Sequence, residues 1–173
     1  MLAPSQIRAE LERCHEDGFG WALACCRWDA AEAEETLQAT YEKVLDGRAR
    51  FGGRASFRTW LFAVIRRTAA ERRRRRLARR LALGRLAGET VEAPVPAPDE
   101  QAAADRLALR LEQALTRLAR RQREVLHLVF YAGLSVEEAS RAMGVSVGSA
   151  RTHYARGKRR LRELLGEDAA DGG

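Results

Sequence analysis

The sequence predicts an all-α protein made of two small helical domains joined by a flexible linker, the C-terminal one a helix-turn-helix. Three observations support this fold class. Apolar residues recur at helical spacing along most of the 173 residues. Three of the four prolines fall in one segment rich in alanine and acidic residues, near the middle of the chain. The segment that ends at Leu165 combines helix caps with a glycine turn.

The N-terminal domain is predicted at residues 1–80 and contains four helices. The predicted helices are Ser5–Asp17, Phe19–Trp28, Asp29–Leu45 and a fourth that begins after Ser56. In the third helix, Asp29 is the expected cap and Glu32 completes a capping box. Its expected inner stripe is Leu37, Tyr41, Val44 and Leu45, and its opposite face carries Glu32, Glu34, Glu35 and Gln38. That acidic face is either a solvated surface or a protein-docking surface.

The fourth helix follows a loop, Arg48–Ala55, that holds Phe51, two glycines and three arginines. Its expected apolar side is Phe57, Trp60, Leu61, Val64, Ile65 and Thr68. Nine arginines and one acid then follow between Arg66 and Arg80, so this segment should fray or need an anionic partner. A disordered tail and a membrane-surface helix are alternatives. The arginines lie all round the helix rather than opposite an apolar face, which favours nucleic acid over a membrane.

Residues 81–104 are predicted to be a flexible linker. The C-terminal domain is predicted at residues 105–165, and residues 166–173 as a disordered tail. Its first helix should bury Leu107, Leu111, Leu115 and Leu118. In the helix-turn-helix, Gly133 should form a left-handed cap, and Ser135 with Glu138 a capping box. Gly144 should make the turn, and Ser146 should cap the last helix.

The last helix separates into two faces. The residues expected to face inward are Ala150, Tyr154, Gly157 and Leu161, and those expected to face outward are Ser149, Arg151, Thr152, His153, Arg156 and Lys158. A helix in a major groove presents its N-terminal half to base edges, where arginine bonds guanine through two hydrogen bonds. Later cations are better placed for phosphates. The alternative is a plain three-helix core with a solvated basic face.

Composition narrows the class of partner. The net charge is +7 and the pI about 10.1, so a polyanionic partner is expected. No apolar run approaches the ~20 residues that span a bilayer, and no signal segment is seen, which predicts a cytoplasmic protein without membrane insertion. Cys14, Cys25 and Cys26, even with His15, do not match a zinc spacing and are expected to be buried free thiols. We therefore expect no metal and no cofactor.

Three stretches together resemble a bacterial RNA polymerase sigma factor of the extracytoplasmic-function group, in the sigma-70 family. They are Glu32–Val44, Phe51–Arg67 and Leu118–Leu165, in the order and spacing of that family. The resemblance implies a protein that directs core RNA polymerase to promoters and assists promoter melting. It also implies the partners: the polymerase (β′ clamp helices and β subunit), promoter DNA and an anti-sigma factor.

The resemblance assigns roles to particular residues. It implies polymerase binding by Glu34, Glu35 and Gln38. It implies contacts with downstream promoter DNA by Phe51, Arg54, Ala55, Ser56, Arg58, Arg66, Arg67 and Arg72. It implies contacts with upstream promoter DNA by Ser149, Arg151, Thr152, His153, Arg156 and Lys158.

Two other functions remain to be weighed. A stand-alone helix-turn-helix transcriptional regulator would need a receiver or effector domain, and residues 1–104 lack the strand–helix alternation of one. An enzyme acting on nucleic acid would need a catalytic constellation, and the sequence contains no P-loop, no GxSxG and no His/Cys/Asp/Glu cluster. The sequence therefore predicts a protein that is not an enzyme.

Overall fold

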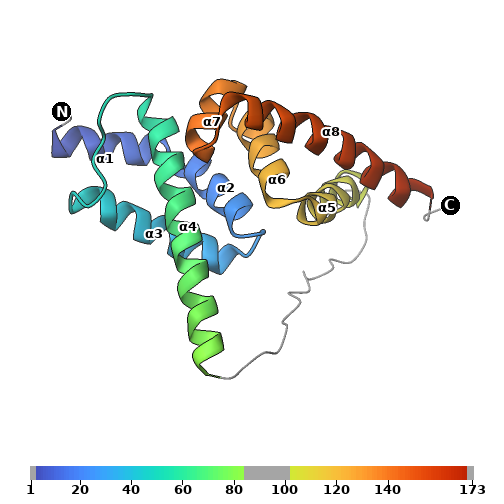
Figure 1. Ribbon diagram of the computed structural model, residues 1–173, viewed down its shortest axis with the longest axis horizontal. Coiled ribbons are helices and arrows are strands. Elements are labelled where there is room, and N and C mark those ends of the chain that lie inside the picture. Colours follow the sequence, from blue (N-terminus) through green and yellow to red (C-terminus); the bar gives the residue numbers. More distant parts are fainter. Residues whose placement is uncertain (1–2, 84–101, 171–173) are drawn as a thin grey trace.

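The structure is a computed structural model that describes residues 3–83 and 102–170. Every secondary-structure element in those ranges is a helix (Figure 1). The N-terminal elements are α1 (Pro4–Arg13), α2 (His15–Cys25), α3 (Ala30–Leu45) and α4 (Phe57–Ala82). The C-terminal elements are α5 (Ala102–Arg117), α6 (Arg120–Leu126), a π-helical turn η1 (His127–Tyr131), α7 (Val136–Met143) and α8 (Val147–Ala170). The predicted all-α fold class is confirmed.

The first helical break lies at Cys14, so the boundary predicted between Asp17 and Phe19 was wrong. Helix α2 runs through Gly18 and Gly20 without interruption. A Cβ atom on Gly18 would lie 3.4 Å from a methyl group of Leu37 and 3.5 Å from one of Ile65. This glycine therefore serves the close packing of α2 on α3 and α4, and it does not end a helix.

Helix α3 begins as predicted, because the Asp29 carboxylate accepts a hydrogen bond from the Glu32 amide at 3.0 Å. The second half of the expected capping box does not form, because the Glu32 side chain turns to arginines of α4 instead. Leu37 and Val44 are buried, whereas Leu45 is 53% exposed. The predicted inner stripe is correct except at its last residue.

Helix α4 is capped by Ser56, which accepts from the Thr59 amide, and it continues through the arginine-rich segment to Ala82. Carboxylates of Glu71 and of α3 pair with several of its arginines, which offsets the self-repulsion that predicted fraying. Both α4 and α5 enter the predicted linker 81–104, and residues 84–101 of it lie outside the described residues. Helix α8 likewise reaches Ala170, inside the predicted tail, whose last three residues also lie outside the described ranges.

The two helical units share one apolar core. Residues from both units form it, among them Trp21, Leu61, Phe62, Ile65, Val125, Leu128, Ala142 and Met143. Trp21 also donates from Nε1 to the Phe62 carbonyl at 2.9 Å, which fixes α2 against α4. Figure 1 shows α7 beside the first half of α4, while the last turns of α4 extend away from the C-terminal unit.

The helix-turn-helix forms as predicted. The Glu138 amide donates to Ser135 Oγ at 3.2 Å, and Glu138 Oε2 accepts from the Ser135 amide at 2.9 Å. Gly133 and Gly144 have φ values of 62° and 63°, the left-handed conformation that glycine adopts without strain. The inward residues Ala150 and Gly157 are buried.

A smaller core joins α5 to α8 and contains Ala114, Leu118, Leu126 and Leu164. The predicted leucine stripe of α5 is wrong at Leu107, which is 60% exposed. Leu111 and Leu115 are half-buried, and Ala114 takes the central buried position. Because alanine is small, α8 can approach α5 closely at this point.

Candidate functional site

The outward face of α8 presents the residues predicted to read upstream DNA. Ser149, Arg151, Thr152 and Arg156 are exposed, and His153 and Lys158 are half-buried. The helix start is fixed because Ser146 Oγ accepts from the Ser149 amide at 3.1 Å. All six residues therefore belong to one short helical segment that begins at a capped end.

Two of these cations already have partners. Arg151 pairs with Glu137 of α7 at 2.8 Å, and the Arg151 side chain is 68% exposed. A backbone hydrogen bond, together with Arg151, lowers the pKa of Glu137 below its ordinary value. The ammonium of Lys158 lies over the Tyr154 ring, 4.3 Å from its centroid. An exposed pair of this kind contributes little to stability, so Arg151 can leave Glu137 at little cost.

The loop before α4 is partly closed by its own aromatic side chain. Phe51 packs edge-on against Trp60 and Phe57, with ring centroids 5.4 Å and 5.5 Å away. The Ser56 hydroxyl is occupied by the cap and by a hydrogen bond to Thr59 Oγ1 at 2.9 Å. Arg54 is exposed and Ala55 half-exposed. Phe51 and Ser56 therefore shape the loop, and its exposed residues are Gly52, Gly53, Arg54 and Ser56.

A cavity of about 380 Å³ opens beside this loop, between α3 and α4. Its lining residues include Lys43, Arg48, Arg50, Trp60, Arg67, Thr68 and Glu71. Lys43 Nζ lies 2.6 Å from Glu71 Oε2 and 3.3 Å from Thr68 Oγ1, and the bond from Lys43 lowers the pKa of Glu71. Arg67, a predicted DNA contact, thus lines the cavity together with Lys43, Arg48 and Arg50, which were not predicted as site residues. The alternation of Arg48 and Arg50 just before Phe51 was the available signal.

Arg58 and Arg66, also predicted to contact DNA, lie instead at the contact between the two units. Arg58 Nε is 2.9 Å from Asp17 Oδ2, and its Nη2 donates to the Ala132 carbonyl at 2.5 Å. Arg66 Nε is 3.0 Å from Glu124, whose side chain is only 1% exposed. The structure therefore does not bring these two arginines together with the loop and the cavity on one accessible surface.

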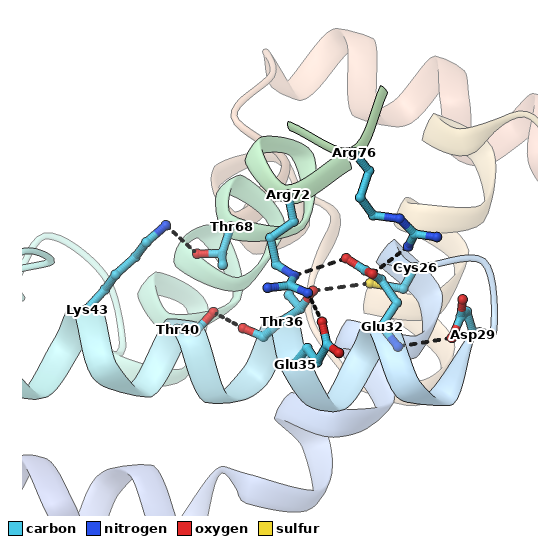
Figure 2. Close-up of polar contacts among 10 residues, drawn as sticks. All are labelled: Cys26, Asp29, Glu32, Glu35, Thr36, Thr40, Lys43, Thr68, Arg72 and Arg76. Atoms are coloured by element: carbon cyan, nitrogen blue, oxygen red, sulfur yellow. Dashed lines mark hydrogen bonds and ion pairs between the residues drawn. The ribbon is translucent and has the colours of Figure 1, made fainter. Parts of the chain in front are cut away.

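The acidic face of α3 meets the basic face of α4 (Figure 2). Glu35, predicted to bind the polymerase, pairs with Arg72, predicted to bind DNA. Glu34 and Gln38 are exposed, and Gln38 Nε2 lies 3.4 Å from Glu42 Oε1. Two surfaces that the sequence predicted separately are in direct contact.

The three cysteines are free thiols, with Cys14 buried and the other two half-buried. Burial raises the pKa of the Cys25 thiol well above its ordinary value, so this thiol stays protonated. Within residues 3–83 and 102–170, His, Cys, Asp and Glu side chains form no group able to hold a metal ion. In the same ranges no helix has the length and apolar character needed to span a bilayer.

Comparison with known proteins places these features in a family. The sigma-70 region 2 profile matches residues 15–80, and the sigma-70 region 4 profile matches residues 108–161. The ECF RNA polymerase sigma factor SigX of Bacillus subtilis is 32% identical over 167 residues, which cover 91% of this chain and 84% of SigX. The RNA polymerase sigma factor CarQ of Myxococcus xanthus is 33% identical over 139 residues, or 80% of this chain and 78% of CarQ.

Two solved structures share the fold. The sigma factor RpoE of Bartonella quintana, in complex with the anti-sigma factor NepR, superposes with a TM-score of 0.73 at 24% identity, covering 91% of this chain and 95% of RpoE. CnrH, in complex with the cytosolic domain of CnrY, superposes with a TM-score of 0.64 at 22% identity, covering 96% and 91%. Because both sigma-70 regions match in order and the similarity to SigX spans most of both chains, the protein belongs to the extracytoplasmic-function group of RNA polymerase sigma factors.

Proposed function

We propose that this sigma factor works as a dissociable initiation subunit, which directs core RNA polymerase to promoters, assists their melting and leaves catalysis to the polymerase. It acts in the bacterial cytoplasm, where the polymerase and the chromosome are found. The observation that carries the proposal is the exposed polar face of α8 on the same chain as the cation-lined cavity beside α4. One chain thus offers two separate surfaces for DNA.

The upstream element is read by α8 in the major groove. Ser149, Arg151 and Thr152 lie near the capped start of the helix, which is the part that reaches base edges. His153 adds a ring nitrogen beside them. Arg156 and Lys158 lie further along and contact phosphates, which adds affinity without sequence preference.

The downstream element contacts Arg54 and Ala55 of the loop, Arg67 of the cavity and Arg72 of α4. Phe51 and Ser56 hold that loop in shape. A base that leaves the stack costs roughly a few kcal/mol, and cations on the neighbouring phosphates offset that cost. Arg58 and Arg66 are engaged at the contact between the units. Their use on DNA therefore requires the two units to move apart.

Protein partners are expected on other faces. Glu34, Glu35 and Gln38 of α3 dock on the β′ clamp helices of the polymerase, and the C-terminal unit contacts the β subunit. An anti-sigma factor is a further expected partner, because RpoE and CnrH were both solved bound to a second protein, which for RpoE is a named anti-sigma factor.

Run-off transcription tests the proposal. Purified core polymerase is assayed on a promoter library from the source genome, with and without the protein. New, specific transcripts are expected only with the protein, and they identify both promoter elements. The absence of any new transcript, together with sequence-specific footprints by the protein alone, would instead indicate a stand-alone regulator.

A charge reversal tests the docking face. Glu34 is exposed and forms no ion pair with any residue that the structure describes, so Glu34→Lys should weaken co-purification with core polymerase without disturbing the packing of α3. Glu16→Lys is the matched control, since it makes the same charge change at an exposed position of α2. Equal binding of both variants at physiological salt would contradict the assignment.

A further inference from the structure

Two carboxylates of α3 and two guanidiniums of α4 form one cluster (Figure 2). Glu32 Oε1 lies 3.0 Å from Arg72 Nε, and Glu32 Oε2 lies 2.5 Å from Arg76 Nη1. Arg72 also pairs with Glu35 through its Nη2. Arg72 thus bridges both carboxylates and Glu32 bridges both arginines, so loss of Glu35 uncovers only the Nη2 group of Arg72.

The cluster has no net charge, since two carboxylates offset two guanidiniums. Its members also differ in access to solvent: the Glu32 side chain is 13% exposed, Arg72 26%, Arg76 47% and Glu35 63%. Burial lowers the pKa of Arg72, but the bonds and charges of Glu32 and Glu35 outweigh that effect and raise it. A partner approaching from solvent therefore meets Glu35 or Arg76 first, while Glu32 and Arg72 form the protected centre.

We propose that this cluster couples polymerase docking to promoter binding: cationic side chains of the polymerase that take up Glu35 free the Nη2 group of Arg72 for a DNA phosphate. The inference rests on the proposed function, in which α3 docks on the polymerase and Arg72 contacts DNA. By linkage, the two binding events must strengthen each other by the same factor. Free protein, in which the arginines are neutralised by α3, should bind the downstream element weakly.

Glu32 acts as the positioning residue of this cluster. It holds Arg72 and Arg76, which lie four residues apart on one face of α4, so that both guanidiniums stay at the helix surface nearest α3. Asp29, the residue before α3, accepts the capping hydrogen bond of that helix, and Lys43, further along α3, is paired with Glu71. The exchange therefore has no competing charge from these two neighbours.

A purely structural role is the competing interpretation. In that case the cluster only holds α3 against α4, and removing the Glu35 carboxylate lowers the stability of the fold without changing DNA binding. The two interpretations differ in the affinity of the free protein for DNA, measured without polymerase.

The test compares Glu35→Gln with Glu42→Gln. Both remove one negative charge from α3, and Glu42 is exposed and outside the cluster. Fluorescence anisotropy would measure binding of the free protein to a single-stranded oligonucleotide that carries the downstream element found by run-off transcription. Glu35→Gln should raise the affinity about 3- to 10-fold and steepen the salt dependence by about 0.7 in log–log slope, the contribution of roughly one added phosphate contact.

The gain should disappear in the double variant Glu35→Gln with Arg72→Gln, and Glu42→Gln should give less than a twofold change. Equal gains for Glu35→Gln and Glu42→Gln, or a gain that survives loss of Arg72, would overturn the proposal, because net charge alone would explain the result. Circular dichroism melts confirm that each variant is folded.

A second arm separates this inference from the proposed function. Adding saturating core polymerase to the wild type should raise oligonucleotide affinity more than it does in the Glu35→Gln and Arg72→Gln double variant. If the wild type binds polymerase and supports transcription, but polymerase raises oligonucleotide affinity equally in the wild type and the double variant, only the proposed coupling is wrong. If wild type neither binds polymerase nor supports transcription, the proposed function itself fails.

Discussion

At the scale of single residues, His127 shows how packing sets a charge state. Its ring stacks on Tyr131, with centroids 5.4 Å apart, and lies 5.6 Å from the Trp21 ring. Burial lowers the pKa of His127 from 6.5 to about 4, and the charge of Asp17 offsets only part of that effect. The neutral imidazole is therefore the form that the folded chain accepts.

This shift makes stability depend on pH. The unfolded chain binds a proton at His127 near pH 6.5, whereas the folded chain resists it down to about pH 4. The contribution to stability is thus fully present above pH 6.5 and is lost as the pH falls toward 4. Urea denaturation should show that the free energy of unfolding falls between pH 7 and pH 5 by about 2 kcal/mol more in the wild type than in His127→Gln.

The matched control is His15→Gln, which removes an exposed imidazole from α2. Its denaturation is measured at the same two pH values, so that the effect of removing an imidazole elsewhere in the chain is known. Identical pH dependence in the wild type and His127→Gln would mean that the ring is protonated in the folded protein at pH 5.

Arg151 gives a residue-scale test of base reading. Arg151→Ala should cost about 1–3 kcal/mol of binding at one upstream base pair and relax the preference there, because arginine bonds guanine through two hydrogen bonds. The stability of the folded chain should change little, since the pair between Arg151 and Glu137 is exposed. Binding titrations over all four bases at each position measure the effect, and an equal loss on every sequence would make Arg151 a phosphate contact.

At the scale of elements, Gly157 sets the distance between α6 and α8. A Cβ atom there would lie 3.2 Å from Gln122 Cβ and 3.3 Å from the Gln122 carbonyl oxygen. Gly157→Leu should therefore overpack the contact and destabilise the protein by about 1–3 kcal/mol in thermal melts.

Gly148 provides the control for this prediction, because it lies in the same helix and no atom lies within 4 Å of the position of its Cβ. Gly148→Leu should leave stability unchanged or raise it by a few tenths of a kcal/mol, since leucine favours helix more than glycine does. Equal losses in the two variants would contradict this prediction, because the close approach of Gln122 to Gly157 would then not be the cause.

Elements that depend on near neighbours in sequence were predictable. The Ser135–Glu138 capping box and the Gly144 turn involve residues a few positions apart, so their spacing alone determined them. The position of the break between α1 and α2 was not predictable, because glycine occurs both in turns and in closely packed helices. Only the approach of Leu37 and Ile65 shows that Gly18 has the packing role.

The residues of the candidate site were likewise predictable only where their position depends on near neighbours in sequence. The outward face of α8 follows from helical period: Ser149, Arg151, Thr152 and Arg156 are exposed as predicted, whereas His153 and Lys158 are half-buried. The positions of Arg58 and Arg66 at the contact between the units depend on Asp17, Ala132 and Glu124, which are far away in sequence. No local pattern distinguishes an arginine that faces DNA from one that faces another helix.

At the scale of the whole molecule, Glu124 joins the two units. Its carboxylate lies 3.0 Å from Arg66 of α4 and also pairs with Arg120 and Arg121. Arg123 beside it donates to the Ala24 carbonyl at 3.2 Å, and burial lowers the pKa of that guanidinium. The contact between the units is therefore specific: the buried carboxylate is paired with arginines, and the buried guanidinium of Arg123 donates to the carbonyls of Ala24 and Leu118.

Removing the carboxylate should loosen this contact. Glu124→Gln leaves Arg66 without its charged partner in a largely buried position, at a cost of about 3 kcal/mol. Urea denaturation would measure the loss, and small-angle scattering would measure the increase in radius of gyration. Glu163→Gln is the control, because that carboxylate pairs with Arg159 and Arg160 at an exposed site, where the cost stays below about 1 kcal/mol. Equal costs would mean that Glu124 does not hold the units together.

The shared core has a consequence for synthesis on the ribosome. Trp21, Phe62 and Ile65 belong to an apolar surface that is completed only by Val125, Leu128 and later residues. At ~5–20 residues per second, that surface stays uncovered for several seconds after α4 has been translated. A chain cut after Leu83 would leave it bare permanently, and such a fragment should sediment as aggregates at concentrations where the full chain remains in solution.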